Sequence, residues 1–262
     1  MTIDRGKRIT FEEVADLYNE VRPNYPDELI EDALALSGIQ ADGHILEIGC
    51  GPGNATLLFA RRGYRILGIE LGGRLAALAT KNCRPYPGVE ILNSAFEDWE
   101  MKEAAFDLAI AADSFHWIPP EVGYPKVARA LKDSGSAAFF WNVPVDPATE
   151  WSKAIEEVYQ TTAPGLENPD KSITAEWIKE IIWRNFSNSG CFGDVTIRQY
   201  FWSIKLTSEQ YLKLLRTFSV HRGLDETIRK NLYTGIRKVL EQFGGQVTKP
   251  QSAILFHAKV RK

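Results

Sequence analysis

An alternation of short apolar runs with helical stretches constrains the fold of this chain more than any other feature. Strands are expected at residues 44–49, 64–70, 89–92, 106–111 and 137–142. Between them the patterns predict helices at 54–62, 74–82 and 124–131. Strands separated by helices of roughly 10–15 residues imply parallel pairing through right-handed crossovers. The sequence therefore predicts a doubly wound, Rossmann-like α/β core over residues 38–142.

The flanking segments are expected to complete the sheet and to cover it. Residues 10–37 predict two helices that form an amino-terminal lid, with Phe11 and Val14 on the apolar face of the first. Residues 143–250 predict a sixth strand and several helices that form a cap, and the last strand is expected within 251–262. The expected architecture is one domain (1–262) with a seven-stranded sheet, mostly parallel with an antiparallel last strand.

Composition favours an ordinary globular protein over a nucleic-acid or membrane protein. The 262 residues are 44% hydrophobic and 25% charged, with a net charge of −3. This charge lacks the positive excess that phosphate contacts need, and no run approaches the roughly 20 apolar residues of a membrane helix. The three cysteines share no metal-type spacing and fit a reducing compartment. We therefore expect a cytoplasmic protein, monomeric or homodimeric, without a bound metal.

A glycine-rich turn follows the first strand of the core. Between Glu47 and Asn54 the chain places glycines at Gly49, Gly51 and Gly53. Glycine adopts positive φ without a steric cost and lets a ligand approach the backbone. The free N–H groups of the next helix face the same ligand. The turn therefore predicts a nucleotide cofactor site, and a tight structural turn without a ligand is the alternative.

Two carboxylates distinguish this turn from a dinucleotide site. Glu47 would repel a pyrophosphate but suits a cationic group such as an amino-acid ammonium. Asn54 stands where the dinucleotide fingerprint has its third glycine. Glu70 ends the second strand, where a carboxylate can accept hydrogen bonds from both hydroxyls of a ribose. These residues disfavour a nicotinamide-dependent oxidoreductase.

At these positions the sequence resembles the class I S-adenosylmethionine-dependent methyltransferases. Glu47 and the three glycines match the first motif of that family, and Glu70 matches its second-strand acid. Residues 93–99, 106–117 and 131–135 resemble its adenine loop, its fourth-strand motif and the turn before its fifth strand. Residues 18–26 resemble a segment of the small-molecule branch, which contains quinone and trans-aconitate methyltransferases.

The resemblance implies a set of residues around S-adenosylmethionine. The implied cofactor-binding residues are Tyr18, Arg22, Glu47, Gly49, Cys50, Gly51, Glu70, Leu71, Ser94, Ala95, Phe96, Ala111 and Asp113. Ser94 departs from the aspartate common in the family's adenine loop, and glycines at 72 and 73 replace Ser-Pro after the second-strand acid.

Several of these residues have a packing alternative. Tyr18 and Arg22 would equally staple the first helix to the sheet, and Phe96 would fill the core. Asp113 would equally cap its loop. Cys50 fits the turn by its small size, and we expect no thiol chemistry from it.

His116 is the candidate catalytic residue, and Trp117 and Trp141 are candidates for an apolar acceptor pocket. His116 follows the fourth strand, at the edge where open α/β sheets bind ligands. A histidine pKa near neutrality suits a general base. The alternative is that His116 and Trp117 anchor the loop by packing and a hydrogen bond.

The function that the resemblance implies is in-line transfer of the methyl group of S-adenosylmethionine to a small molecule. Holding both reactants in line can lower the barrier by as much as about 7–11 kcal/mol. A protein base is needed only when the acceptor is an unionised hydroxyl or a carbon acid. The alternative is a noncatalytic S-adenosylmethionine-binding protein that keeps the same fold.

Overall fold

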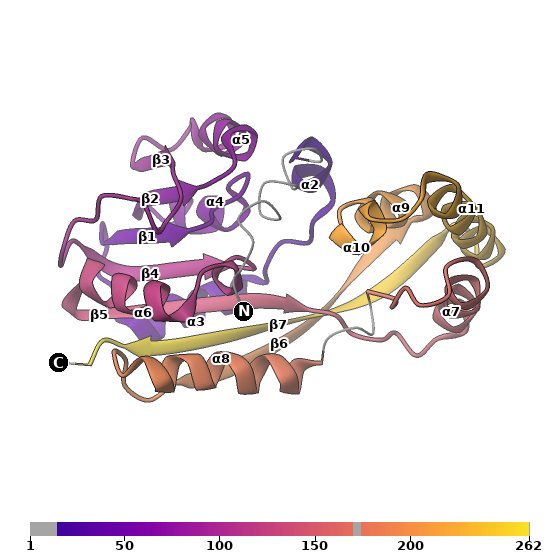
Figure 1. Cartoon of the computed structure of the whole chain (residues 1–262). Helices are drawn as coiled ribbons and strands as arrows, with labels where there is room; N and C mark the ends of the chain where they lie inside the picture. The colour runs from indigo at the N-terminus through magenta and orange to yellow at the C-terminus, as the bar shows by residue number, and fades with distance from the viewer. Residues whose placement is uncertain (1–14, 170–173, 262) are drawn as a thin grey trace.

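The computed structural model describes residues 15–169 and 174–261, which contain one seven-stranded sheet (Figure 1). The strands are β1 (His44–Ile48), β2 (Arg65–Glu70), β3 (Val89–Asn93), β4 (Phe106–Ala112), β5 (Leu131–Val143), β6 (Thr196–Thr207) and β7 (Gln246–Lys259). Their order is β3-β2-β1-β4-β5-β7-β6. The first five strands are parallel, and β7 is antiparallel to both of its neighbours. The doubly wound, mostly parallel sheet is confirmed.

Helices connect the strands and cover both faces of the sheet. They are α2 (Ala15–Val21), α3 (Asp27–Ser37), α4 (Asn54–Ala60), α5 (Gly73–Cys83), the 3-10 turn η2 (Phe115–Trp117), α6 (Pro120–Ala130), α7 (Glu150–Thr162), α8 (Ala175–Ser189), α9 (Ser208–Arg216), α10 (Ser219–Arg222) and α11 (Glu226–Gln242). None of the helices in the described ranges is long and apolar enough to span a bilayer.

Alternate residues of the central strands enter two separate cores. Ile45 of β1 and Phe140 of β5 pack with Leu29, Ile30 and other side chains of α3 and α4. Their neighbours along the same strands, such as Leu46 and Phe139, pack on the other face against α6 and α8. Each fully buried Leu, Ile or Phe contributes about 1.5–3 kcal/mol by leaving water. This two-sided burial holds the strand ends in the fixed register on which the site depends.

A third core forms where β6 and β7 extend beyond the sheet. There Leu206 and Val247 pack with apolar side chains of α7, α9 and α11, including Tyr211 and Ile236. We call α7, α9, α10 and α11 the cap, and it forms the right-hand lobe in Figure 1. The expectation that all helices after β5 form a cap is wrong for α8. Ile178 and its neighbours on that helix pack in the core under the sheet.

Several expected boundaries also need correction. The helix expected at 124–131 begins at Pro120, because proline suits the first turn of a helix. Leu131 opens β5 instead of ending that helix, so the turn expected at 131–135 is the irregular start of the strand. The last strand begins at Gln246, because residues 246–257 pair with all twelve residues of β6. Phe11 and Val14, expected on the lid helix, lie outside the described residues.

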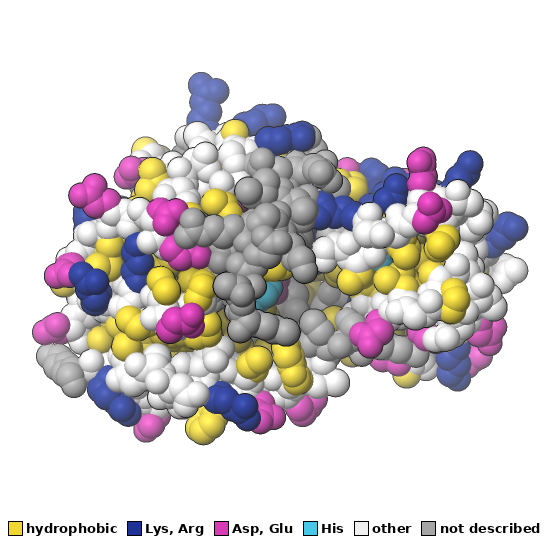
Figure 2. Space-filling model, viewed as in Figure 1, with side chains coloured by type: hydrophobic (Ala, Val, Ile, Leu, Met, Phe, Trp, Pro, Cys, Tyr) yellow, Lys and Arg dark blue, Asp and Glu magenta, His cyan; other side chains and the backbone are white. Residues whose placement is uncertain are grey.

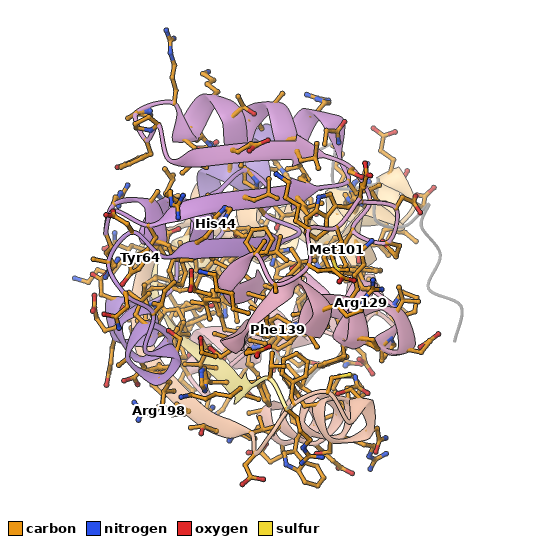
Figure 3. All side chains as sticks on the ribbon, turned by 90° about the vertical axis from the view of Figure 1, so that its left-hand side faces the viewer. His44, Tyr64, Met101, Arg129, Phe139 and Arg198 are labelled. Atoms are coloured by element: carbon orange, nitrogen blue, oxygen red, sulfur yellow. The ribbon has the colours of Figure 1, made fainter. Side chains whose placement is uncertain are left out.

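The parallel strands run from left to right in Figure 1, so their carboxyl ends face α2 and the cap. Figure 3 views the opposite end, where His44 opens β1 and Tyr64 precedes β2. In an open parallel sheet, ligands bind beyond the carboxyl ends, where the strand order reverses. Here that point lies between β1 and β4.

Candidate functional site

Two adjoining cavities lie at the carboxyl ends of β1, β2 and β4. The larger is an open cleft of about 770 Å³ whose walls include Glu70, Leu71, Phe96 and Trp117. The smaller is lined by Arg22, Tyr25, Glu47, Cys50 and Asn142, among others. Gly49, Gly51, Ala112 and Asp113 line both. The glycine turn therefore separates an apolar compartment from a polar, charged one.

The turn reaches this position through two glycines with different requirements. Gly49 has a φ of +69°, and a Cβ added there would lie 2.6 Å from Cβ of Ser114. Gly51 has a φ of +57°, but a Cβ added there would meet no atom within 4 Å. Gly49 is thus needed for packing of the protein itself. At Gly51 the space is open, as expected where a ligand passes close to the backbone.

Glu70 ties this turn to the end of β2. Its Oε2 accepts a hydrogen bond from the N–H of Gly51, and its Oε1 accepts one from the N–H of Gly72, both at 2.8 Å. The side chain is 8% exposed and lines the larger cleft. Two backbone donors therefore fix this carboxylate at the cleft wall while it remains in reach of a ligand.

Glu47 is a buried carboxylate without a described hydrogen-bond partner. The residue is fully buried, and neither carboxylate oxygen accepts a hydrogen bond from any residue that the structure describes. Burial, opposed by Thr56 and helped by the charge of Glu70, raises the pKa of Glu47 to about 8. A buried carboxylate of this kind is costly unless a cation or a proton joins it. Because Glu47 lines the smaller cavity, the ammonium of a ligand there would fit this requirement.

Asp113 holds together three segments that are far apart in the sequence. The hydroxyl of Tyr25 donates to its Oδ2 at 2.5 Å, and the backbone and side-chain N–H groups of Asn142 donate to the same carboxylate at 2.9 and 3.1 Å. Asp113 itself has a φ of +54°. Burial raises its pKa, while Tyr25, the charge of Arg22, and Asn142 oppose the shift. Asp113 thus fastens the segment after α2 to the ends of β4 and β5.

His116 lies beside this site but outside the lining of both cavities. The indole Nε1–H of Trp141 donates to its Nδ1 at 3.0 Å. Although the side chain reaches the surface, the protein packed around it lowers the pKa of His116 to about 4. An Nδ1 that accepts from an indole leaves the ring proton on Nε2. His116 is therefore neutral and presents a donor at its remaining nitrogen.

Of the other expected site residues, some line the larger cleft and others are buried in the protein core. Leu71, Phe96 and Trp117 line the larger cleft. Trp141 is only 5% exposed and packs edge-on against Phe256, outside both linings. Ala111 is completely buried, and its neighbour Ala112 takes the position at the site.

The remaining four expected residues are Ser94, Ala95, Cys50 and Tyr18. Ser94 directs its hydroxyl to the carbonyl of Ala95, and neither residue lines a cavity. Cys50 lines the smaller cavity, and burial raises the pKa of its thiol well above the usual range. Tyr18 belongs to α2, and its side chain lies outside the described part of the chain.

Sequence reasoning missed Tyr25, Asn142 and Ser114. Tyr25 and Asn142 hold Asp113, and Ser114 donates its hydroxyl to the carbonyl of Ile48 at 2.5 Å. Tyr25 falls in the segment that resembled the small-molecule branch, so a signal for it was present. Ser114 lies within residues 106–117, which resemble the fourth-strand motif, so a signal for it was also present. Asn142 lies near the end of β5 and belongs to none of the matched motifs.

Across the described residues, no group of three or more His, Cys, Asp and Glu side chains is arranged to hold a metal. The site is instead a cleft with an apolar wall, the carboxylate of Glu70 hydrogen-bonded to the glycine turn, and the buried carboxylate of Glu47 behind that turn. This combination lies where the strand order of the sheet reverses, which is the place where open α/β folds bind their ligands.

Comparison with known proteins finds methyltransferases. A family model described as a methyltransferase domain matches residues 45–135. An uncharacterized methyltransferase of Mycobacterium tuberculosis is 26% identical over 159 residues, which are 59% of this chain and 60% of that protein. A 23S rRNA (uracil-C5)-methyltransferase of Acidithiobacillus ferrooxidans is 33% identical, but over only 44% of this chain and 26% of that protein.

Solved structures share the fold at low identity. A protein of Anaeromyxobacter dehalogenans, assigned as a type II methyltransferase, is 20% identical, with a TM-score of 0.63 over 91% of this chain and 96% of that one. A phosphoethanolamine N-methyltransferase of Haemonchus contortus is 16% identical, with a TM-score of 0.54 over 96% of this chain and 58% of that one. The domain match at residues 45–135, the methyltransferase relatives and the shared fold support a class I S-adenosylmethionine-dependent methyltransferase. It spans about 60% of the length of the mycobacterial relatives that it matches.

Proposed function

We propose that this protein transfers the methyl group of S-adenosylmethionine to a small molecule by in-line displacement. The observation that carries the proposal is the pair of carboxylates around Gly51. Glu70 lies at the wall of the apolar cleft, and Glu47 lies buried behind the polar cavity without a described partner. An adenosyl group and a cationic amino-acid group are the two parts of one ligand that these compartments suit.

Specific residues would hold each part of the cofactor. Glu70 would accept hydrogen bonds from the ribose hydroxyls, and Phe96 with Leu71 would enclose the adenine. Glu47 would attract the ammonium, and Arg22, which lines the same cavity, would attract the carboxylate. When bound, S-adenosylmethionine supplies a methyl group made electrophilic by its sulfonium sulfur.

The protein itself would position the two reactants and exclude water from them. Asp113, held by Tyr25 and Asn142, keeps the shared wall of the two cavities in place. Trp117 adds an apolar wall to the cleft. His116 would orient the acceptor by donating a hydrogen bond from Nε2, and its low pKa makes it a poor general base. Catalysis would therefore depend chiefly on alignment of the two reactants.

A small acceptor is favoured over a nucleic acid. The chain carries a net charge of −3, whereas phosphate backbones require a concentrated positive surface. The match to the rRNA methyltransferase covers about a quarter of that protein. Free Cys50, Cys83 and Cys191 support a reducing, cytoplasmic setting.

Binding and turnover can be tested separately. Titration calorimetry should show S-adenosylhomocysteine binding at micromolar affinity, about −8 kcal/mol. A panel of small acceptors, read out by S-adenosylhomocysteine formation, then identifies the substrate. Binding without turnover on any acceptor would favour a noncatalytic S-adenosylmethionine-binding protein. Absence of binding by the folded protein would refute the proposal.

A further inference from the structure

A second large cleft, separate from the cofactor cavities, lies between α2 and the cap. Leu17 of α2 and Leu212 of α9 form its apolar part. Five cations also line it: Arg216, Arg222, Arg229, Lys230 and Arg237. Glu226 is the one carboxylate among its lining residues. This concentration is unusual for a chain whose net charge is −3.

Three of the five cations form no salt bridge with a described carboxylate, although Arg237, and with it the charge of Arg216, lowers the pKa of Glu209. Arg237 pairs with Glu209 at 2.6 Å. Arg216, Arg229 and Lys230 form no salt bridge with any carboxylate in the described ranges. Like charges held in one cleft repel each other and raise the local positive potential. An anion that enters the cleft would relieve this repulsion.

Tyr233 adds a neutral hydrogen-bond donor to the same cleft. Its hydroxyl is buried and has no hydrogen-bond partner among the residues that the structure describes. The ring stacks on His221 at an interplanar angle of 14°, and the guanidinium of Arg216 lies 5.7 Å from its centroid. A buried hydroxyl without a partner is costly, and an oxygen of a bound anion would satisfy it.

We propose that this cleft binds a small anion with two or more negative charges, either a phosphate ester or a polycarboxylate. The planar guanidinium groups of arginine donate two parallel hydrogen bonds to either kind of oxyanion. The cations are confined to the cleft, since Glu209 and the Lys213–Glu20 pair lie beside it on α9 and α2. Figure 2 shows both signs of charge interspersed over the cap. A small anion fits this confined charge better than a nucleic acid does, because a nucleic acid needs an extended basic surface.

The cleft is connected to the cofactor cavities through α2. Leu17 lines the basic cleft, whereas Arg22, the residue after this helix, lines the cavity that contains Glu47. An anion that holds α2 against α9 and α11 would therefore also hold Arg22 in place. This coupling rests on the proposed cofactor site, but the anion site itself does not.

Inorganic pyrophosphate and citrate are suitable probes of the two anion classes. Each is titrated by calorimetry and by thermal shift, with sodium chloride at matched ionic strength as reference. We expect at least one probe to bind at millimolar concentration or below and to raise Tm beyond the effect of chloride. Arg229→Gln and Arg216→Gln should each weaken binding about tenfold or more. Glu226→Gln should strengthen it.

Arg184→Gln is the matched control, because Arg184 lies on α8, pairs with Glu180 and is 60% exposed. It removes the same charge outside the cleft and should leave anion binding unchanged. Equal effects of chloride and both probes, or equal weakening in the control, would overturn the proposal. Tighter binding of a single-stranded RNA oligonucleotide than of either probe would overturn the small-anion assignment. Titration of S-adenosylhomocysteine into the same variants tests independently whether the cofactor site is still folded.

Discussion

Trp141 donates its indole N–H to Nδ1 of His116 at 3.0 Å, and this one contact determines what His116 can do. The indole is a donor only, so Nδ1 accepts and the ring proton resides on Nε2. The packed surroundings lower the pKa of His116 to about 4. The ring is therefore neutral throughout the physiological pH range and donates instead of accepting a proton.

The first prediction tests this role with two substitutions. His116→Ala should raise the acceptor KM about three- to tenfold, the value of one hydrogen bond, with donor affinity unchanged. His116→Gln should recover part of the loss, because its amide also donates. The pH profile of kcat should show no limb near pH 6.5 that depends on His116. A general base would instead give a loss of about 10²–10⁴-fold in kcat for His116→Gln.

The two glycines of the turn should respond differently to alanine. Gly51→Ala should leave a folded protein that is about 1–2 kcal/mol less stable, because φ is positive there, and it should weaken S-adenosylhomocysteine binding at least tenfold. Gly49→Ala should destabilise the protein more, because its Cβ would collide with Ser114. Urea unfolding and calorimetry on both variants measure these effects. Wild-type affinity in Gly51→Ala would place the ligand elsewhere.

Glu70→Ala should affect both stability and binding. The substitution leaves the N–H groups of Gly51 and Gly72 without their acceptor and removes the carboxylate from the cleft wall. We expect S-adenosylhomocysteine binding to weaken by about 1.5–3 kcal/mol, measured by calorimetry. If affinity is unchanged while the protein is less stable, Glu70 serves the turn and does not contact the ribose.

Glu47 should make the ligand-free protein less stable as pH rises. Its folded pKa of about 8 lies above the ordinary value of 4.5, so between these values the folded state holds a proton that the unfolded state has lost. The free energy of unfolding should therefore fall with pH in this window, by up to about 1.4 kcal/mol per unit, and Glu47→Gln should remove that contribution. Urea unfolding between about pH 5 and pH 8 compares the two proteins.

The same carboxylate predicts proton release on ligand binding. An ammonium beside Glu47 favours its charged form and lowers its pKa, so the wild type should release a proton near neutral pH when S-adenosylhomocysteine binds. Calorimetry in buffers of different ionisation enthalpy measures this release. Equal release by Glu47→Gln would show that another group supplies the proton.

The clamp on Asp113 gives a stability prediction. Tyr25→Phe should lower the free energy of unfolding by about 1.5–3 kcal/mol, because it removes a hydrogen bond to the half-buried carboxylate of Asp113. Tyr64→Phe is the matched control, since Tyr64 lies at the amino end of β2, away from the site (Figure 3). A thermal or urea unfolding experiment that shows equal losses for both variants would contradict the clamp.

The local pattern of the sequence determined the parallel core, because apolar strands, helical periods and the glycine turn depend on nearby residues. Glu47, Gly51 and Glu70 were predicted together for this reason, since parallel strands bring their carboxyl ends to one edge. The resemblance to a known family extended this set to Leu71 and Phe96, which line the cleft.

Only the tertiary structure decided which polar groups are paired and which are left open. Tyr25, Asp113 and Asn142 are separated by up to 117 residues, the difference between 142 and 25, and share no sequence pattern, yet they meet in one hydrogen-bonded clamp. The indole that holds His116 comes from another strand. The basic cleft gathers side chains of α2, α9, α10 and α11, whose packing depends on an apolar core at the far ends of β6 and β7. Such contacts depend on how layers pack, and local periodicity carries no information about them.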